Sequence, residues 1–295
     1  SQRGFALSTD SNPRWCALDP RTGTALTVAE SVANLACVGA TPKAVVNCLN
    51  FGNPEHPEVM WQLSEAVDGM SEACEAFGLP VIGGNVSLYN ESGGRDIDPT
   101  PVVGVVGLVD SLLAPPPGWA WRTGDTVFLV GHREAVGKQA FPLGGSRWAT
   151  QRGRRGGHLP GFDGQRLRPV NTFIAGEVAA VCAGQASDLT AVHDVAAGGV
   201  GVALASMVVA AGVGVQVGEA TEAAELFSEF PGRFVVATSD PQAFAARAAH
   251  AGVPVTVLGT AGGDELVIAD LVRVSVAQLA DRRGGALERA LQLAD

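Results

Sequence analysis

The stretch VIGGNVSLYN, residues 81–90, joins a short apolar run to two glycines, an asparagine and a serine. The apolar run predicts a short buried strand over residues 79–82 that ends at the glycine pair. Glycine lets another group approach the backbone closely, and successive amides in such a turn can hold an anion. The side-chain oxygen of Asn85 suits a hard cation such as Mg²⁺ already held by phosphates, and the Ser87 hydroxyl can contact a phosphate or a carbonyl. A tight turn closed by the asparagine itself is the alternative that this motif leaves open.

A second polar turn, VVNCLNFGNPE, covers residues 45–55. Residues 44–49 predict a strand, so three asparagines gather where this strand ends. Tolerance of turn geometry explains Asn53, which precedes Pro54. The same argument does not explain Asn47, which lies between Val46 and Cys48. We therefore take Asn47 as another candidate contact.

The composition excludes several classes of protein. The chain has 295 residues, 46% of them hydrophobic, and a formal net charge of -10. An acidic chain is a poor general nucleic-acid binder, because it lacks the basic face that meets phosphates. The uncharged run over residues 196–218 is interrupted by glycines and predicts a core helix rather than a membrane span. Five scattered cysteines and an N-terminus without a signal pattern favour a reducing, cytoplasmic location.

Strands and helices alternate in both halves, which predicts an α/β or α+β fold of two layers. The proline-rich connector LAPPPGW, residues 113–119, suggests two domains, residues 1–113 and 114–295. The clearest helix covers residues 63–77 and ends at Gly78. We also expect residues 14–18 to resume a strand, a capping box at Thr27 and Glu30 to start a helix, residues 142–169 to form a long loop, and Asn171 to cap the next helix.

The segment LNFGNPEHPEVMWQLSEAVDGMSEACEAFGLPVIGGNVSLYNES, residues 49–92, resembles the second half of phosphoribosylformylglycinamidine synthase. The resemblance continues through STDSNPRWCALDP, PTPVVGVVGLVD, HDVAAGG and LFSEFPGRFVVAT, so it covers nearly the whole chain. The family uses ATP to phosphorylate the amide oxygen of formylglycinamide ribonucleotide (FGAR), and ammonia then displaces the phosphate to give the amidine. The resemblance thus implies a ligase of purine biosynthesis with ATP and Mg²⁺ as cofactors.

The family's large subunit is an internal duplication of a PurM-like two-domain unit, the fold of aminoimidazole ribonucleotide synthetase. An α/β first domain pairs across a pseudo-dyad and an α/β second domain covers it. This chain resembles only the second copy, with the first strand of its first domain missing. The family's catalytic histidine lies in the first copy, so the resemblance implies no catalytic residue here.

The resemblance also implies a role for each residue of the opening motif. Gly84 matches an ATP-binding glycine, Asn85 a Mg²⁺ ligand and Ser87 a substrate-binding serine. Asn47 falls where the family often has an ATP-binding aspartate, and its neutral amide cannot supply the same charge to a metal. In HDVAAGG, Ala196 and Ala197 replace the Ser-Asp of many relatives.

Other polar features have simpler readings. Gly144, Gly145 and Ser146 are candidates for a phosphate contact, because free amides and a hydroxyl converge there. His193 precedes Asp194, which allows a proton relay or, more simply, a hydrogen-bonded turn histidine. The arginines of residues 147–168 favour a solvated loop over a phosphate site. No two histidines have zinc-site spacing.

Three hypotheses follow. In the first, the chain is a catalytically incomplete part of the ligase, and its partners are the N-terminal half of the same enzyme, a glutaminase subunit or domain, and the small-molecule substrate FGAR. In the second, the chain is a non-catalytic auxiliary nucleotide-binding or dimerisation module. The third is a stand-alone relative such as aminoimidazole ribonucleotide synthetase. Without its pseudo-dyad partner the first domain should expose apolar sheet surface, which favours a homodimer.

Overall fold

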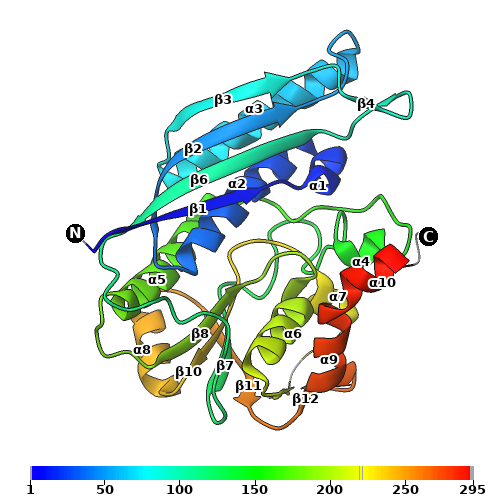
Figure 1. The fold of residues 1–295 in the computed structure, drawn as a ribbon. Coiled ribbons are helices and arrows are strands. Elements are labelled where there is room, and N and C mark those ends of the chain that lie inside the picture. The colour runs from blue at the N-terminus through cyan, green and yellow to red at the C-terminus, as the bar shows by residue number, and fades with distance from the viewer. Residues whose placement is uncertain (1, 219, 221, 293–295) are drawn as a thin grey trace.

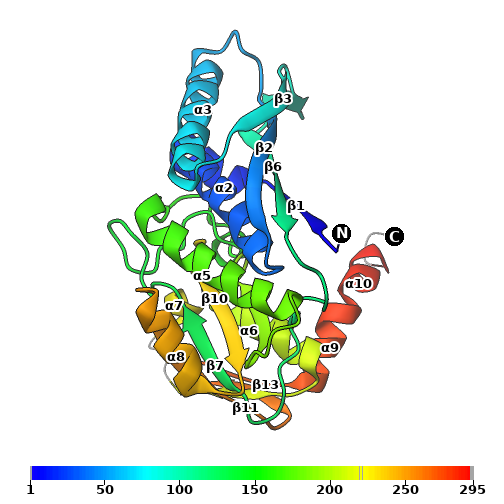
Figure 2. The same ribbon diagram turned by 90° about the vertical axis from the view of Figure 1, so that its left-hand side faces the viewer.

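The computed structural model describes residues 2–218, 220 and 222–292, which form two large sheets covered by helices and one small two-stranded sheet (Figures 1 and 2). The first sheet has the strand order β1-β6-β2-β3. Its strands are β1 (Gly4–Asp10), β6 (Thr100–Val109), β2 (Thr41–Asn50) and β3 (Val81–Ser87). β6 is antiparallel to both of its neighbours, whereas β2 and β3 are parallel. Two edges of this sheet, β1 and β3, therefore remain unpaired within the described part of the chain.

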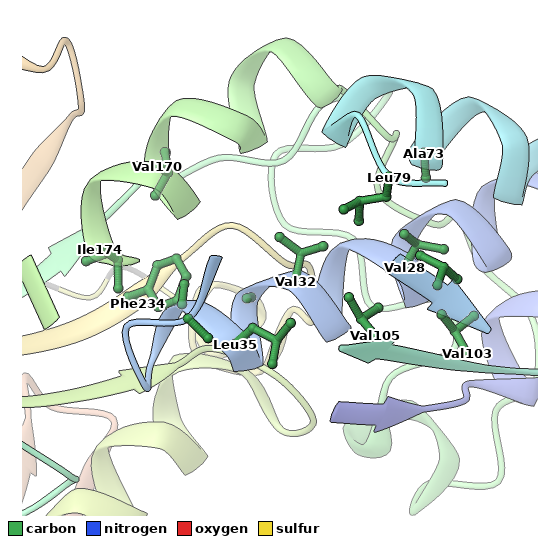
Figure 3. Packing of buried hydrophobic residues seen from close by; sticks show 14 of the residues in the cluster. Val28, Val32, Leu35, Ala73, Leu79, Val103, Val105, Val170, Ile174 and Phe234 are labelled. Atoms are coloured by element: carbon green, nitrogen blue, oxygen red, sulfur yellow. The ribbon is translucent and has the colours of Figure 1, made fainter. Parts of the chain in front are cut away.

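Helices α2 (Pro20–Ala36) and α3 (Pro57–Phe77) lie on one face of the first sheet (Figure 2). The buried side of β6 presents Val103 and Val105 to Val28 and Val32 of α2 (Figure 3). The opposite face, which we call the open face, leaves Phe5, Leu7 and Val46 exposed by 85%, 70% and 43%. The predicted exposure of apolar sheet surface in the first domain is thus confirmed.

Two predictions for the N-terminal helices are wrong. Residues 14–18 form a helix, α1 (Pro13–Leu18), because the Asn12 side chain accepts the Trp15 N–H and Pro13 fits the first turn. α2 begins at Pro20, capped by Asp19, which accepts the Thr22 N–H. Thr27 is buried inside this helix and donates to the Gly23 carbonyl, so it caps nothing.

The second sheet has the order β13-β12-β9-β11-β7-β10-β8. Its strands are β7 (Thr126–Val130), β8 (Leu189–Asp194), β9 (Val215–Val217), β10 (Phe234–Thr238), β11 (Val255–Ala261), β12 (Glu265–Ile268) and β13 (Val272–Ser275). Alternate residues of β7 face two different clusters: Phe128 and Val130 pack with α5 (Gly164–Cys182) and α8 (Pro241–His250), whereas Val127 and Leu129 pack with α6 (Gly199–Ala211). Helices therefore cover both faces.

The two halves share one buried cluster. Leu35 of α2 lies near Ile174 of α5 and Phe234 of β10, as Figure 3 shows. Residues 110–125 connect the sheets without a helix or strand. We keep the proposed domain boundary at residue 113, inside this connector.

The remaining elements are short: β4 (Glu91–Ser92), β5 (Arg95–Asp96), α4 (Arg147–Thr150), α7 (Ala223–Phe227), α9 (Val276–Gly284) and α10 (Ala286–Gln292). α4 and the first part of α5 occupy residues predicted as loop. Asp163 caps α5, so Asn171 lies inside that helix and the predicted cap is wrong. No helix among the described residues is long and apolar enough to cross a membrane.

Candidate functional site

The opening motif lies in a strand rather than at the end of one. β3 continues from Val81 to Ser87, and its residues pair with β2 up to the contact of Ser87 with Asn50. Neither Gly83 nor Gly84 has a positive φ. The predicted glycine turn is therefore wrong: β3 extends because its parallel neighbour β2 continues beside it.

Gly84 and Asn47 are direct neighbours across the two parallel strands. A Cβ atom at Gly84 would overlap the Asn47 side chain and would lie 2.6 Å from the Asn47 carbonyl oxygen. The Asn47 side chain also donates from Nδ2 to the Met70 sulfur of α3 at 3.3 Å. The group that approaches the backbone closely at Gly84 is thus Asn47 of this chain and not a ligand. A Cβ at Gly83 would meet nothing within 4 Å, so the open position is the preceding glycine.

Asn85 and Ser87 project from the other face of the sheet. Residues on β3 alternate sides, and Asn85 pairs with Cys48, one position beyond Asn47. The strand alternation puts both side chains on the open face, with Val46. The four predicted residues therefore form two pairs on opposite faces, and no single point within the chain brings all four together.

Two further asparagines belong to this neighbourhood. Asn50 donates from Nδ2 to the carbonyls of Cys48 and Thr100, both at 3.1 Å. Asn90 donates from Nδ2 to the Ser87 carbonyl at 2.9 Å and contacts its hydroxyl at 3.1 Å. The Ser87 hydroxyl is therefore held by Asn90 at the end of β3. Asn50 was visible in the sequence as part of the polar turn, but nothing in the sequence linked Asn90 to Ser87.

Two cavities of the described part of the chain lie away from the motif of residues 81–90. One of about 400 Å³ is lined by Phe5, Leu7 and Leu35, and one of about 350 Å³ lies between α2 and α5. Neither contains Gly84, Asn85 or Ser87 in its lining. The side chains of the motif therefore face open surface, which a second body would have to cover to form a pocket.

The turn considered for phosphate in the second domain, residues 144–146, and the turn before α6 converge on a side chain of this protein. The N–H groups of Arg147 and Gly198 both donate to one carboxylate oxygen of Glu229, each at 2.7 Å. Glu229 is 2% exposed, and burial raises its pKa although these amides and Arg14 oppose the rise. Ser146 is itself buried and caps α4 by accepting the Ala149 N–H. Glu229 thus fills the anion position that the two turns create.

His193 makes a hydrogen bond from ring atom Nδ1 to the neighbouring residue. His193 Nδ1 lies 2.6 Å from the Asp194 carbonyl oxygen, and its ring stacks on Trp119 with centroids 4.6 Å apart. His193 lies in β8 rather than in a turn, and the same Nδ1 is 3.3 Å from the Asp194 carboxylate, so the structure shows a hydrogen-bonded histidine of a strand.

The side chains of the site provide few ligands for Mg²⁺. Asn85 offers one neutral oxygen, and no group of three or more His, Cys, Asp or Glu residues within the described residues could hold a metal ion. A hard cation needs about six oxygen ligands. The residues present fit Mg²⁺ only as a supplement to ligands from elsewhere, such as nucleotide phosphates.

Comparison with known proteins defines the class. Residues 1–109 match the family model "AIR synthase related protein, N-terminal domain", and residues 122–271 match "AIR synthase related protein, C-terminal domain". The chain therefore belongs to the AIR synthase related proteins, and the predicted PurM-like α/β fold of two domains is confirmed.

Curated relatives are more specific. The chain is 43% identical over 276 residues to phosphoribosylformylglycinamidine synthase subunit PurL of Moorella thermoacetica, covering 91% of this chain and 36% of that protein. The PurL of Leifsonia xyli is 42% identical over 294 residues, with shares of 94% and 36%. These relatives confirm the resemblance seen in the motifs. The chain spans a little over a third of their length.

Solved structures show the same fold. Thermotoga maritima PurL complexed with FGAR superposes with a TM-score of 0.73 at 19% identity, covering 94% of this chain and 46% of that one. T. maritima PurL complexed with ATP gives 0.57 at 24% identity, with shares of 89% and 36%. At these identities the match establishes the fold.

Proposed function

We propose that this chain acts as the C-terminal half of a phosphoribosylformylglycinamidine synthase. It would supply contacts to a composite site whose remaining residues, the catalytic histidine included, come from an N-terminal half. The reaction joins ammonia to FGAR. ATP transfers its γ-phosphate to the amide oxygen of FGAR, and the nitrogen of ammonia then displaces that phosphate from the amide carbon. The products are the amidine, ADP and phosphate.

The observation that carries this proposal is the direction of Asn85 and Ser87. Both leave the sheet on the open face, where Val46 of β2 is exposed next to Gly83 and where Phe5 and Leu7 are exposed on β1, the opposite edge strand. A monomeric protein rarely exposes such a surface unless something binds it. A site on this face is open to solvent until a partner covers it, which agrees with a chain matching only part of its relatives' length.

Within this proposal each residue has a role. Ser87, held by Asn90, would hydrogen-bond FGAR, and Asn85 would complete the oxygen ligands of a Mg²⁺ ion held by ATP. When bound, Mg²⁺ would offset the negative charge of the phosphates during transfer. An ATP molecule at the edge of β3 would contact the backbone of Gly84, whereas Asn47 lies behind it on β2 and would act on ATP only through the position of β3. The relatives support these partners, because T. maritima PurL has been crystallised with FGAR and with ATP.

A reconstitution experiment tests the proposal. The chain is mixed with a separately produced N-terminal half of a PurL relative, and ADP release is measured with FGAR, ammonia and Mg-ATP. We expect turnover that needs both halves and falls at least about tenfold in Asn85→Ala and Ser87→Ala, because each removes a polar contact to a bound ligand. Gln242→Ala, an exposed change on α8, is the control and should retain full activity. Turnover that survives both site changes would refute the composite site.

The open face also supports a second candidate, a dimerisation scaffold. Exposed Phe5 and Leu7 would be buried equally well against a second copy of this chain. Light scattering of the isolated chain distinguishes the cases: a dimer that dissociates when the N-terminal half is added supports the composite enzyme, and one that persists supports the scaffold. A glutaminase partner and a cytoplasmic location follow from the proposed enzyme.

A further inference from the structure

The loop after β2 and the segment after β3 are joined by backbone hydrogen bonds. The Phe51 N–H donates to the Ser87 carbonyl at 3.0 Å, and the Tyr89 N–H donates to the Gly52 carbonyl at 2.8 Å. Asn90 adds a side-chain bond from Nδ2 to the Phe51 carbonyl at 3.0 Å. Ser87 is therefore the first residue of a unit formed by residues 51–56 and 87–97.

Asp96 fastens the far end of this unit with both carboxylate oxygens. Oδ1 accepts the Asn53 N–H at 2.7 Å, and Oδ2 lies 2.7 Å from His56 Nδ1. Asp96 also packs directly on Gly52, where a Cβ atom would lie 2.5 Å from the Asp96 side-chain carbons. These contacts join β5 to the loop that leads into α3, which begins immediately after His56.

The solvent exposure of His56 and Asp96 decides whether they can exchange protons with solvent. The His56 side chain is 48% exposed, so its ring can exchange protons with solvent, while Asp96 is 24% exposed. Asp96 is 40 residues away along the chain, and no sequence pattern linked the two.

We propose that Asp96 and His56 form a clasp that positions Ser87, by holding residues 51–56 against residues 87–97, and that the clasp loosens when His56 loses its proton. Both are positioning residues. The assignment of Ser87 as the contact served by the clasp rests on the proposed function.

The sign of the pH dependence follows from the neighbours. Hydrogen bonding to Asp96, with smaller contributions from Glu58 and Glu91, raises the pKa of His56. Its contribution to stability is therefore complete below the ordinary histidine pKa of about 6.5 and is lost as pH rises through the raised value. The Asn53 N–H and then His56 lower the pKa of Asp96, so its contribution is lost only in acid. A neutral imidazole can still donate from Nδ1, which weakens the clasp without opening it.

Amide hydrogen exchange on the isolated chain tests the clasp without any need for activity. Asp96→Ala removes two hydrogen bonds, so we expect protection of the Asn53, Tyr89 and Phe51 amides to fall by more than about fivefold, the effect of a single lost bond. In His56→Gln protection should fall clearly near pH 6 and much less near pH 9, relative to the parent protein and after correction for intrinsic exchange. His158→Gln, an exposed histidine in a loop, is the matched control and should change nothing.

Unchanged protection in Asp96→Ala, or a loss in His56→Gln of the same size at both pH values, would overturn the clasp. An NMR titration of the His56 ring gives an independent check, because its pKa should drop toward the ordinary value in Asp96→Asn. In the reconstituted enzyme, Asp96→Asn should raise KM for FGAR severalfold while kcat stays near the parent value. If reconstitution gives no turnover, the proposed function fails, and the exchange experiment still decides the clasp.

Discussion

Gly83 and Gly84 look equivalent in the sequence, yet the structure predicts opposite responses to the same substitution. In Gly84→Ala the added methyl would lie 2.6 Å from the Asn47 carbonyl oxygen, a backbone atom of a central strand that cannot move without disturbing β6. In Gly83→Ala the methyl would meet nothing within 4 Å. The first change must displace β3, whereas the second adds only exposed surface.

The magnitudes follow from these contacts. Overpacking of this kind costs about 1–3 kcal/mol, so Gly84→Ala should lower the free energy of unfolding by about 2 kcal/mol. Gly83→Ala should be neutral or stabilise by up to about 1 kcal/mol, since alanine restricts the unfolded chain more than glycine does. The two variants share composition and strand, so each controls for the other.

Urea denaturation followed by circular dichroism measures the difference, with the slope against urea checked for constancy. Mg-ATP binding, measured by calorimetry in the reconstituted protein, separates stability from function. If a ligand approaches the backbone at the open glycine, Gly83→Ala should weaken binding without loss of stability. Equal stability of the two variants would show that Asn47 does not occupy the space at Gly84, and would refute the reasoning.

Substitutions at three other positions test the rest of the fold. Glu229→Ala leaves the Arg147 and Gly198 amides without their buried acceptor and should destabilise by about 2–5 kcal/mol in thermal or urea unfolding, whereas Glu229→Gln keeps an acceptor and should cost less than half as much. Burial raises the pKa of Glu30 to about 8, so stability should fall as pH rises from about 4.5 through 8, and Glu30→Gln should flatten that part of the pH profile of unfolding. Asp19→Ala removes the α2 cap and should cost about 1 kcal/mol by the same unfolding measurement. A Glu229→Gln as damaging as Glu229→Ala, an unaltered pH profile, or no loss at Asp19 would each contradict the corresponding contact.

Sequence patterns predicted the elements whose determinants are local. The apolar stripe of α3 and the left-handed Gly78 that follows it are set by neighbouring residues, and both were predicted correctly. The start of α8 is set in the same local way, by the capping Asp240 and by Pro241 in the first turn. The prediction of the start of α2 failed because two local signals competed. Thr27 and Glu30 have capping-box spacing, yet both lie inside the helix. The helix begins earlier, at Pro20, where Asp19 caps it.

The error at β3 had a non-local cause. Two glycines normally weaken a strand, and nothing between residues 79 and 90 says that the strand continues. It continues because β2 offers a parallel ladder as far as Asn50. The pairing of Glu229 with two helix starts is equally invisible in sequence, since its partners lie 82 and 31 residues away.

The separation of the four motif residues onto two faces bears on the unusual asparagine at position 47. The Asn47 amide fills the space beside Gly84 and donates to the thioether sulfur of Met70 in α3. An ionised aspartate could not make this contact, because it has no proton to donate. The departure from the family's aspartate is therefore compatible with a role in packing β3 against α3. Asn85 and Ser87 lie on the opposite, open face, which is where the proposed function places the contacts to ligand.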